Sequence, residues 1–529
     1  MNKQRSILNY LPIVVAISVV AGLYLGKFLY EDESNSPIVF SGGSGGKVDE
    51  VIEEIVENYV DPINEKEITE YTISKLLAHL DPHSTYIPPK EVEEEKERMS
   101  VKFEGIGIEF RVIEDTLFVV NAIEGGPSQK AGITAGDRII GVNNKEIALG
   151  KLETDSLVSL LRGKAGSAVN LMVYRPFDEG KIDIEVIRGE IPIYSLDAAF
   201  MISNNIGFIK INRFSSQTAD EFKTAAKTLV NFGAQKFIID VRDNPGGSLY
   251  SVVDICDELL PSGRNIVYTK DENNQETYNS SSDGEFIDKE IAILVNQNSA
   301  SASEILAGAL QDNDAATIIG RRTFGKGFVQ GVFNLKDRSR IHLTIARYYT
   351  PSGRCIQKEF EKDDLYSYHN EELTRWESGE LYHRDSIKTV DSLTYKTLKG
   401  KTVYGGGGVI PDEFVAYDTT MNSKLLFDII EKDLMRNYAI KFYTPNKIKG
   451  NDFEASSQSL SQSEIILPFK KFIVANGIQW NEKDWETSKK YITNRLSAYI
   501  LRVKFNNKGY FKKTAELDKD ILKALEILN

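Results

Sequence analysis

The sequence IAILVNQNSASASEILAGALQDND, residues 291–314, is an apolar run followed by small residues and then by a helical pattern. The run at 291–295 has the length and branched side chains of a buried strand. Glu304 would lie in the first turn of the helix, where an acid is favourable. The segment therefore predicts a strand, a turn and a helix, with a serine hydroxyl beside unpaired helix N–H groups that can stabilise an oxyanion.

A second segment, TFGKGFVQ at 323–330, offers a base. A serine hydroxyl is a poor nucleophile unless a neighbouring group takes its proton, and a lysine can do so when burial lowers its pKa. Lys326 stands between two glycines and beside two phenylalanines whose bulk can exclude water. On residue chemistry alone, Ser299, Ser301 and Ser303 remain equal candidates, and each could serve only as a helix cap.

These segments resemble the C-terminal processing (tail-specific) serine peptidases, a family with a PDZ domain. SASE at 301–304, AGALQD at 307–312 and TFGKGFVQ stand in the family's order, and Lys326 follows Ser301 at the family's spacing of 25 residues. The resemblance implies Ser301 as nucleophile, Lys326 as general base and Gln330 as the residue that positions the lysine.

The turn DNPGG at 243–247 follows an apolar strand pattern and exposes backbone N–H groups, as an oxyanion hole requires. The resemblance assigns that hole to the N–H groups of Gly246 and Ala302, with Gly247 left open as the alternative to Gly246. The family often has two asparagines where this chain has Asp243 and Asn244. We do not read this departure as a loss of activity.

Short strand patterns and glycine turns from about residue 100 to 190 resemble a PDZ domain. In that family the segment equivalent to Gly105, Ile106, Gly107 and Ile108 is a carboxylate-binding loop. Its backbone N–H groups receive a peptide C-terminus, and the peptide adds a strand to the sheet edge. The resemblance therefore implies a site for the free tails of polypeptide substrates.

The N-terminus predicts a membrane anchor. Lys3 and Arg5 precede an apolar span from residue 7 to about residue 30, close to the ~20 residues that cross a bilayer. Positive charge before the span places the following chain outside the cytoplasm. No convincing cleavage site follows, so we expect an uncleaved single-pass anchor in the cell (inner) membrane and a periplasmic catalytic region.

Composition sets broader limits. The 529 residues suffice for three or four domains, and the net charge of −13 argues against nucleic acid as the principal partner. The expected fold is a crotonase/Clp-like layered α/β peptidase core with an inserted PDZ domain, an N-terminal helical module and a helical C-terminal region. The expected domains are an anchor at 1–30, a flexible linker at 31–46, the helical module at 47–99, the PDZ domain at 100–190, the Ser/Lys peptidase core at 191–415 with an insertion at 359–400, and the helical region at 416–529.

Other segments receive simpler interpretations. The charge run at 91–98 predicts a solvated helix face, and LDPHSTY at 80–86 is similar to a family signature with a structural role. His342, with Asp240 as its acid, is the best candidate for a conventional Ser/His/Asp triad, but a half-buried structural histidine is the more common case. The insertion suggests a lid or an interaction surface, and the C-terminal helices suggest packing or oligomerisation. For the chain as a whole, a homo-oligomer or a regulatory adaptor is an expected partner.

The sequence thus predicts a serine endopeptidase that cleaves extracytoplasmic proteins near their C-termini and captures their tails with its PDZ domain. The Ser/Lys chemistry requires no metal and no organic cofactor. Two alternatives stay open. One is a catalytically silent, membrane-tethered PDZ scaffold, and the other is a crotonase-like acyl transfer enzyme, because the same oxyanion hole would serve thioesters.

Overall fold

The computed structural model describes residues 46–99, 101–147, 154–176, 180–362, 364–460 and 462–529. The described chain divides into two units, one ending at Thr72 and the other running from Ile73 to Asn529. The expected anchor at 1–30 lies outside the described residues, as does the expected linker apart from Gly46. Among the residues that the structure describes, no helix is long and apolar enough to span a membrane.

Three helices form the N-terminal region, as the sequence predicts: α3 (Lys47–Asn58), α4 (Glu65–Leu80) and α5 (Pro89–Met99). The acidic and basic residues of α5 were expected to face solvent, and this prediction is wrong for Glu95. Its side chain is 8% exposed, and its carboxylate lies 2.8 Å from Arg340 and 2.6 Å from His342. The Arg340 cation, far along the chain, makes burial of this acid favourable.

The region that resembles a PDZ domain is an antiparallel sheet in the order β3-β4-β5-β7-β8, with β6 beside β5. Its core is a cluster of buried aliphatic side chains, including Leu117, Val119 and Leu171. Strands β2 and β9 pair with each other and join this sheet to the rest of the chain. The elements are β2 (Lys102–Gly105), β3 (Ile108–Ile113), β4 (Thr116–Ala122), α6 (Pro127–Lys130), β5 (Arg138–Val142), β6 (Lys145–Glu146), α7 (Thr154–Leu161), β7 (Ala168–Arg175), β8 (Gly180–Ile187) and β9 (Gly189–Pro192).

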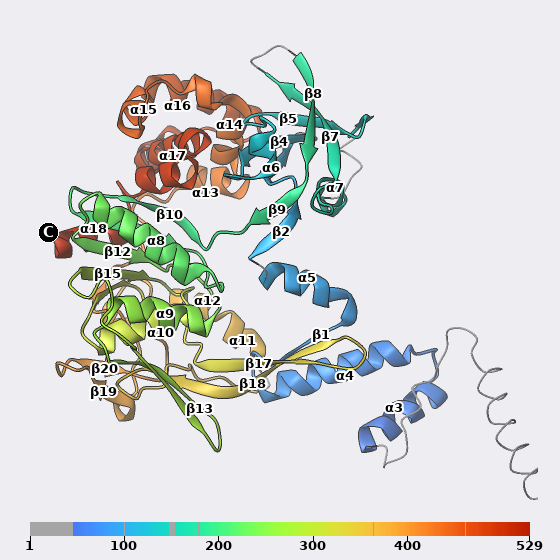
Figure 1. The fold of residues 1–529 in the computed structure, drawn as a ribbon, viewed down its shortest axis with the longest axis vertical. Helices are drawn as coiled ribbons and strands as arrows, with labels where there is room; N and C mark the ends of the chain where they lie inside the picture. Colours follow the sequence, from blue (N-terminus) through green and yellow to red (C-terminus); the bar gives the residue numbers. More distant parts are fainter. Residues whose placement is uncertain (1–45, 100, 148–153, 177–179, 363, 461) are drawn as a thin grey trace, which may run out of the picture. The chain divides into compact units, whose positions relative to one another are not determined.

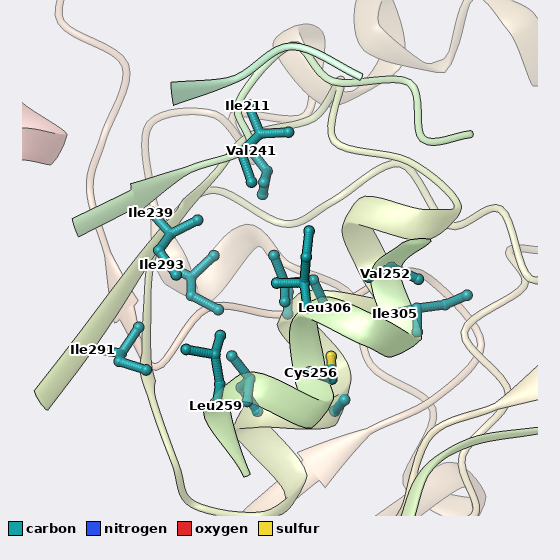
Figure 2. Packing of buried hydrophobic residues seen from close by; sticks show 14 of the residues in the cluster. Ile211, Ile239, Val241, Val252, Cys256, Leu259, Ile291, Ile293, Ile305 and Leu306 are labelled. Carbon is teal, nitrogen blue, oxygen red and sulfur yellow. The ribbon is translucent and has the colours of Figure 1, made fainter. Parts of the chain in front are cut away.

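The centre of the catalytic region is a sheet in the order β10-β11-β12-β15-β16-β21, in which only the edge strand β10 runs antiparallel to its neighbour. One face packs against α8, α9 and α10; Figure 2 shows Ile239 and Ile293 of the strands facing Val252 and Leu306 of the helices. The other face packs against α18. The elements are β10 (Leu196–Met201), β11 (Ile206–Ile211), α8 (Thr218–Asn231), β12 (Lys236–Asp240), α9 (Leu249–Leu259), β15 (Glu290–Val295), α10 (Ala302–Asp312), β16 (Thr317–Gly320), β21 (Glu413–Phe414) and α18 (Lys519–Leu528).

A second sheet, ordered β1-β18-β13-β14 with β17 also on β18, holds the segment that contains the candidate base. Strand β17 (Phe328–Asn334) begins two residues after Lys326 and pairs with β18 (Arg340–Tyr349). Strand β1 (Thr85–Ile87) pairs with the other edge of β18, which brings the LDPHSTY segment to the same sheet. The remaining strands are β13 (Asn265–Lys270) and β14 (Gln275–Asn279).

The C-terminal region is helical, as predicted. Its helices are α13 (Lys424–Glu431), α14 (Leu434–Phe442), α15 (Phe453–Ser459), α16 (Gln462–Ala475) and α17 (Glu482–Thr514), and they share one apolar core. Helix α17 contains a kink at Phe505 and Asn506. Helices α14 and α17 also contact strand β4 of the PDZ-like sheet (Figure 1).

Candidate active site

Ser301 occupies a strained turn between β15 and α10. Its φ of 54° and ψ of −114° are rare for a residue with a side chain. Among the three candidate serines, the hydroxyl of Ser299 donates to the carbonyl of Val241 at 2.8 Å, and that of Ser303 donates to the carbonyl of Asn244 at 2.9 Å. Both are fully buried, whereas Ser301 is half-buried. Within the described residues, Ser301 is thus the candidate serine whose hydroxyl donates to no carbonyl oxygen; it is also the N-cap of α10, and its role as nucleophile stays a prediction.

The turn with the candidate oxyanion donors lies against Ser301. A Cβ added to Gly246, whose φ is 102°, would stand 2.7 Å from the Cβ of Ser301 and 2.9 Å from the N of Ala302. The N–H of Gly246 already donates to Oδ1 of Asn244 at 2.9 Å. The N–H of Gly247 has no hydrogen-bond partner among the described residues. The loop therefore lies where an oxyanion hole would be, and the choice between the two glycines stays open.

Lys326 is largely buried, and desolvation lowers the pKa of its amine below the usual 10.5. The nearby carboxylates of Glu304 and Asp81 act against this by favouring the charged form. A lowered pKa is the property that a lysine base requires. The structure shows no hydrogen bond between Ser301 Oγ and Lys326 Nζ in its described part, so the dyad itself stays a prediction.

Glu304 connects the two predicted catalytic residues, and sequence reasoning missed this role. Its Oε2 accepts the backbone N–H of Ser301 at 2.9 Å and that of Lys326 at 2.8 Å. Its Oε1 accepts the N–H of Gly325 at 2.7 Å and the hydroxyl of Thr323 at 2.5 Å. Desolvation raises the pKa of this fully buried carboxyl to about 7, although the four donors favour its ionised form.

Tyr348 holds the same two residues from their carbonyl side. Its buried hydroxyl lies 3.2 Å from the carbonyl oxygen of Ser301 and also hydrogen-bonds the carbonyl oxygen of Lys326. The side chain comes from β18 and was not singled out in the sequence. Glu304 and Tyr348 together bind the N–H and C=O groups of both predicted catalytic residues. The backbone on either side of the site is therefore fixed before any substrate binds.

The LDPHSTY segment is hydrogen-bonded to β18, the strand that pairs with the Gln330 strand, which agrees with the structural role expected for it. Asp81 Oδ2 accepts the hydroxyl of Ser84 at 2.6 Å, and Ser84 Oγ accepts the N–H of Thr344 at 3.1 Å. Gln330 Nε2 donates to the hydroxyl of the same threonine at 3.4 Å. In the described structure no hydrogen bond joins Gln330 to Lys326, so the positioning role of Gln330 stays a prediction.

The insertion supports the segment that carries Lys326. Arg375 on α12 (Glu371–Glu377) donates to the carbonyl oxygens of Arg322, Thr323 and Phe324 at 3.1, 3.0 and 3.3 Å. Tyr368 on α11 (Leu365–His369) lies with Phe328 on the wall of a cavity of about 980 Å³. The insertion is therefore part of the base's surroundings. The rest of it comprises η2 (Arg384–Ser386), η3 (Asp391–Leu393) and β19 (Thr394–Lys396), and β20 (Thr402–Tyr404), which pairs with β19, follows the insertion.

The alternative triad is not assembled. His342 Nε2 lies 2.6 Å from Glu95, and Asp240 is paired with Lys210 at 3.1 Å and with Arg242 at 2.7 Å. Within the part of the chain that the structure describes, no group of three or more His, Cys, Asp or Glu side chains could hold a metal ion.

The predicted carboxylate-binding loop has the tight backbone that its glycines permit. Gly107 has a φ of 73°, and a Cβ added to it would stand 2.7 Å from Cδ1 of Ile191. The carbonyl oxygens of Ile106 and Gly107 accept N–H groups from Ser128 at 2.9 Å and Ile123 at 3.0 Å. The loop carbonyls are thus turned toward their own domain. The carboxylate-binding role of Gly105, Ile106, Gly107 and Ile108 stays a prediction.

Comparison with known proteins identifies the modules. Residues 205–366 match peptidase family S41, residues 105–186 match the PDZ domain, and residues 425–506 match a family of unknown function. The carboxy-terminal processing protease CtpA of Bacillus subtilis (strain 168) is 33% identical over 314 residues, which cover 59% of this chain and 66% of that protein.

The carboxy-terminal-processing protease of Bartonella bacilliformis (strain ATCC 35685 / KC583 / Herrer 020/F12,63) is also 33% identical, over 58% of this chain and 71% of that protein. The chain thus spans about two thirds of the length of these relatives. A solved photosystem II D1 C-terminal processing protease is 28% identical, covering 58% of this chain and 83% of that one, with a TM-score of 0.34. With its mixed α/β core and its PDZ domain, the chain belongs to peptidase family S41, among the carboxy-terminal processing serine proteases.

Proposed function

We propose that this chain cleaves extracytoplasmic polypeptides near their C-termini, with Ser301 as nucleophile and Lys326 as general base. One observation carries the proposal. Glu304 accepts the backbone N–H groups of these two residues, and the Tyr348 hydroxyl hydrogen-bonds their carbonyl oxygens. A fully buried carboxyl with a raised pKa, hydrogen-bonded to the backbones of one serine and one lysine, marks this pair as a candidate functional site. Family membership supports the reaction class.

In this mechanism the amine of Lys326 takes the proton of the Ser301 hydroxyl as Oγ attacks the scissile carbonyl carbon. The negative oxygen of the tetrahedral intermediate accepts N–H groups from Ala302 and from Gly246, with Gly247 as the alternative donor. Lys326 returns the proton to the leaving amine, and the C–N bond breaks. Water then attacks the acyl-enzyme and loses its proton to Lys326. The ester C–Oγ bond breaks, Lys326 returns the proton to Ser301 Oγ, and the new C-terminus is released. Gln330 orients the amine.

The PDZ domain would select the substrate through the loop of Gly105, Ile106, Gly107 and Ile108, which receives the tail carboxylate. The match of residues 105–186 to the PDZ family supports this role. The apolar span at 7–30, preceded by Lys3 and Arg5, supports a membrane-anchored enzyme with a periplasmic catalytic region. A homo-oligomer or a regulatory adaptor remains compatible with this arrangement.

The test is cleavage of an unstructured protein with an apolar C-terminal tail by the full chain, followed by intact mass. Cleavage should be abolished in Ser301→Ala and Lys326→Ala and retained in a matched control, His342→Gln, whose ring is paired with Glu95. Cleavage that persists in Ser301→Ala would reject the proposed nucleophile.

Capture of the tail needs its own measurement. A fluorescent peptide with a free carboxylate should bind the chain, and the same peptide with an amidated end should bind much more weakly. Tail binding without any cleavage by the parent would favour the PDZ scaffold. Thioester turnover that depends on Ser301 or on the oxyanion loop, without peptide cleavage, would favour acyl transfer.

A further inference from the structure

The last helix of the chain is bonded to the strand end that precedes the oxyanion loop. Arg242, one residue before that loop, donates from one terminal nitrogen to Asp518 at 2.9 Å and to Asp520 at 2.8 Å. Its other terminal nitrogen donates to Asp240 at 2.7 Å. Asp518 is the N-cap of α18 and Asp520 lies in its first turn. Both terminal nitrogens of the Arg242 guanidinium are therefore held, one by α18 and the other by Asp240. We expect the position of the Arg242 backbone to depend on α18 as a result.

A second arginine connects α18 to the loop that precedes Ser301. Arg321, at the end of β16, lies 3.4 Å from Asp520 and also 3.4 Å from the amide oxygen of Gln297. The side chains of Arg321 and Asp520 are only 10% and 5% exposed. A pair this deeply buried is weakly screened by solvent.

The two loops are also hydrogen-bonded to each other. The backbone N–H of Asp243 donates to Oδ1 of Asn296 at 2.9 Å, and Nδ2 of Asn296 donates to Oδ1 of Asp243 at 2.8 Å. The N–H of Ala300 donates to the carbonyl of Asn244 at 3.0 Å. A displacement of Arg242 would therefore shift both the candidate oxyanion donors and Ser301.

Helix α18 is itself held firmly against the central sheet. Ile521, Ala524 and Leu528 are buried in the cluster that covers one face of the central sheet. Asp518 Oδ1 caps the helix by accepting the N–H groups of Asp520 and Ile521 at 3.0 and 3.1 Å. The helix is thus fixed to the sheet, and its acidic first turn points at the two arginines.

We propose, on the basis of the peptidase function proposed above, that Asp518 and Asp520 are positioning residues for the reaction. Through Arg242 and Arg321 they hold the oxyanion loop and the loop before Ser301 in the geometry of the tetrahedral intermediate. Neither aspartate touches the reacting atoms. The C-terminal end of the chain, which lies outside the matched peptidase segment, therefore completes the catalytic site.

Two variants of the full chain test the proposal. Asp518→Ser keeps an N-cap side chain and removes the ion pair with Arg242, and Asp520→Asn keeps the shape of the side chain. The matched control is Glu526→Gln on the same helix, whose side chain is 71% exposed and, among the described residues, forms an ion pair only with Lys523, at 3.2 Å. Asp518→Glu serves as the conservative rescue.

We expect kcat of both variants to fall about tenfold, less than the ~100-fold cost of deleting a direct oxyanion donor. KM and binding of a free-carboxylate tail peptide should stay unchanged, and Asp518→Glu should recover most of the rate. Activities are normalised by titrating Ser301 with a fluorophosphonate. A lower melting temperature with an unchanged kcat per titrated site would overturn the proposal, because it would show a purely structural role.

Hydrogen exchange provides a readout that does not depend on turnover. Amides in residues 243–247 and 296–303 should exchange faster in Asp518→Ser and Asp520→Asn than in Glu526→Gln. If the parent cleaves no polypeptide, the proposed function fails while exchange still decides the positioning role. Unchanged exchange at both loops would refute that role even in an active enzyme.

Discussion

The backbone N–H of Lys326 donates to Oε2 of Glu304 at 2.8 Å, and the same oxygen accepts the N–H of Ser301 at 2.9 Å. One carboxylate oxygen therefore sets the separation of the two predicted catalytic backbones. The carboxylate also raises the pKa of the Lys326 amine, against the desolvation that lowers it. Glu304 thus influences both the position and the protonation of the proposed base.

Replacing Glu304 by glutamine should reduce cleavage and change its pH dependence. The amide keeps the shape but turns an N–H donor toward two N–H donors, which leaves buried groups unpaired at a cost of about 1–3 kcal/mol each. We expect kcat to fall at least about tenfold. Loss of the negative charge should lower the pKa of Lys326 further, so the acidic limb of kcat/KM should move to lower pH.

The measurement is the pH profile of kcat/KM for the parent and Glu304→Gln. The control is Tyr348→Phe, which loosens the same backbone without removing a charge. An acidic limb that stays in place, or moves equally in the control, would show that the Glu304 charge does not act on the base.

Glu304 should also make folding stability depend on pH. Its pKa is about 7 in the folded chain against an ordinary value of 4.5, so the folded state binds this proton more tightly. Its contribution is therefore most favourable below pH 4.5 and falls by about 3 kcal/mol as the pH rises to about 7. Asp240 and Glu371, whose pKa is lowered to about 2 by arginine and lysine neighbours against desolvation, stay ionised across that window.

Urea unfolding across that pH window checks this expectation. The difference in unfolding free energy between the parent and Glu304→Gln should shrink with rising pH, because only the parent titrates at this position. A difference that stays constant between pH 4.5 and about 7 would contradict it.

Gly246→Ala should abolish turnover while leaving the PDZ domain able to bind tails. The added Cβ would stand 2.7 Å from the Cβ of Ser301, at a φ of 102° that alanine rarely adopts. The loop must shift, and we expect kcat to fall by about 100-fold or more. The same peptide-binding assay run in parallel separates this effect from unfolding. A fully active variant would mean that Gly246 does not border the reacting atoms.

The sequence predicted the strand, turn and helix around Ser301 because apolar period and cap residues are local signals. It could not distinguish Ser301 from Ser299 and Ser303 on residue chemistry, since the backbone dihedrals of the turn decide which hydroxyl is left without a carbonyl partner. The family spacing supplied that choice. Lys326 could also be predicted from local sequence, because glycines and phenylalanines flank it in the chain.

The residues that support the site were missed because their partners are distant in the sequence. Glu304 reads as an ordinary first-turn acid until residues 323–326 are brought beside it. Glu95 belongs to a charge run that predicts a solvated face, but pairing of β1 with β18 places Arg340 and His342 against it. Buried ion pairs between distant segments leave no periodic signal that a single sequence could reveal.

His342→Gln should retain cleavage, because the imidazole is paired with Glu95 and does not serve Ser301. We expect kcat/KM within about threefold of the parent, together with a small loss of stability of about 1 kcal/mol from the broken pair. Steady-state kinetics and a thermal melt measure the two effects. A loss comparable to that of Lys326→Ala would restore the histidine as a candidate base.

The contact between the PDZ domain and the C-terminal helices should weaken when one of its charges is reversed. Arg502 on α17 binds both carboxylate oxygens of Glu109 on β3 at 2.9 Å, and Ile440 of α14 joins a small apolar cluster with three PDZ side chains. Arg502→Glu places two like charges together. Because the Glu109 side chain is 44% exposed, the effect should be modest, about a threefold faster exchange of amides in β3 and α14.

The double variant Arg502→Glu/Glu109→Arg should return exchange to the parental rate, since the pair is restored with reversed polarity. Lys512→Glu is the matched control on the same helix, because Lys512 pairs with Glu454 outside the PDZ contact. If the double variant exchanges as fast as the single one, the ion pair does not hold the PDZ domain. If cleavage of tailed substrate changes only in the single variant, the helical region also governs how the PDZ domain delivers its tail to Ser301.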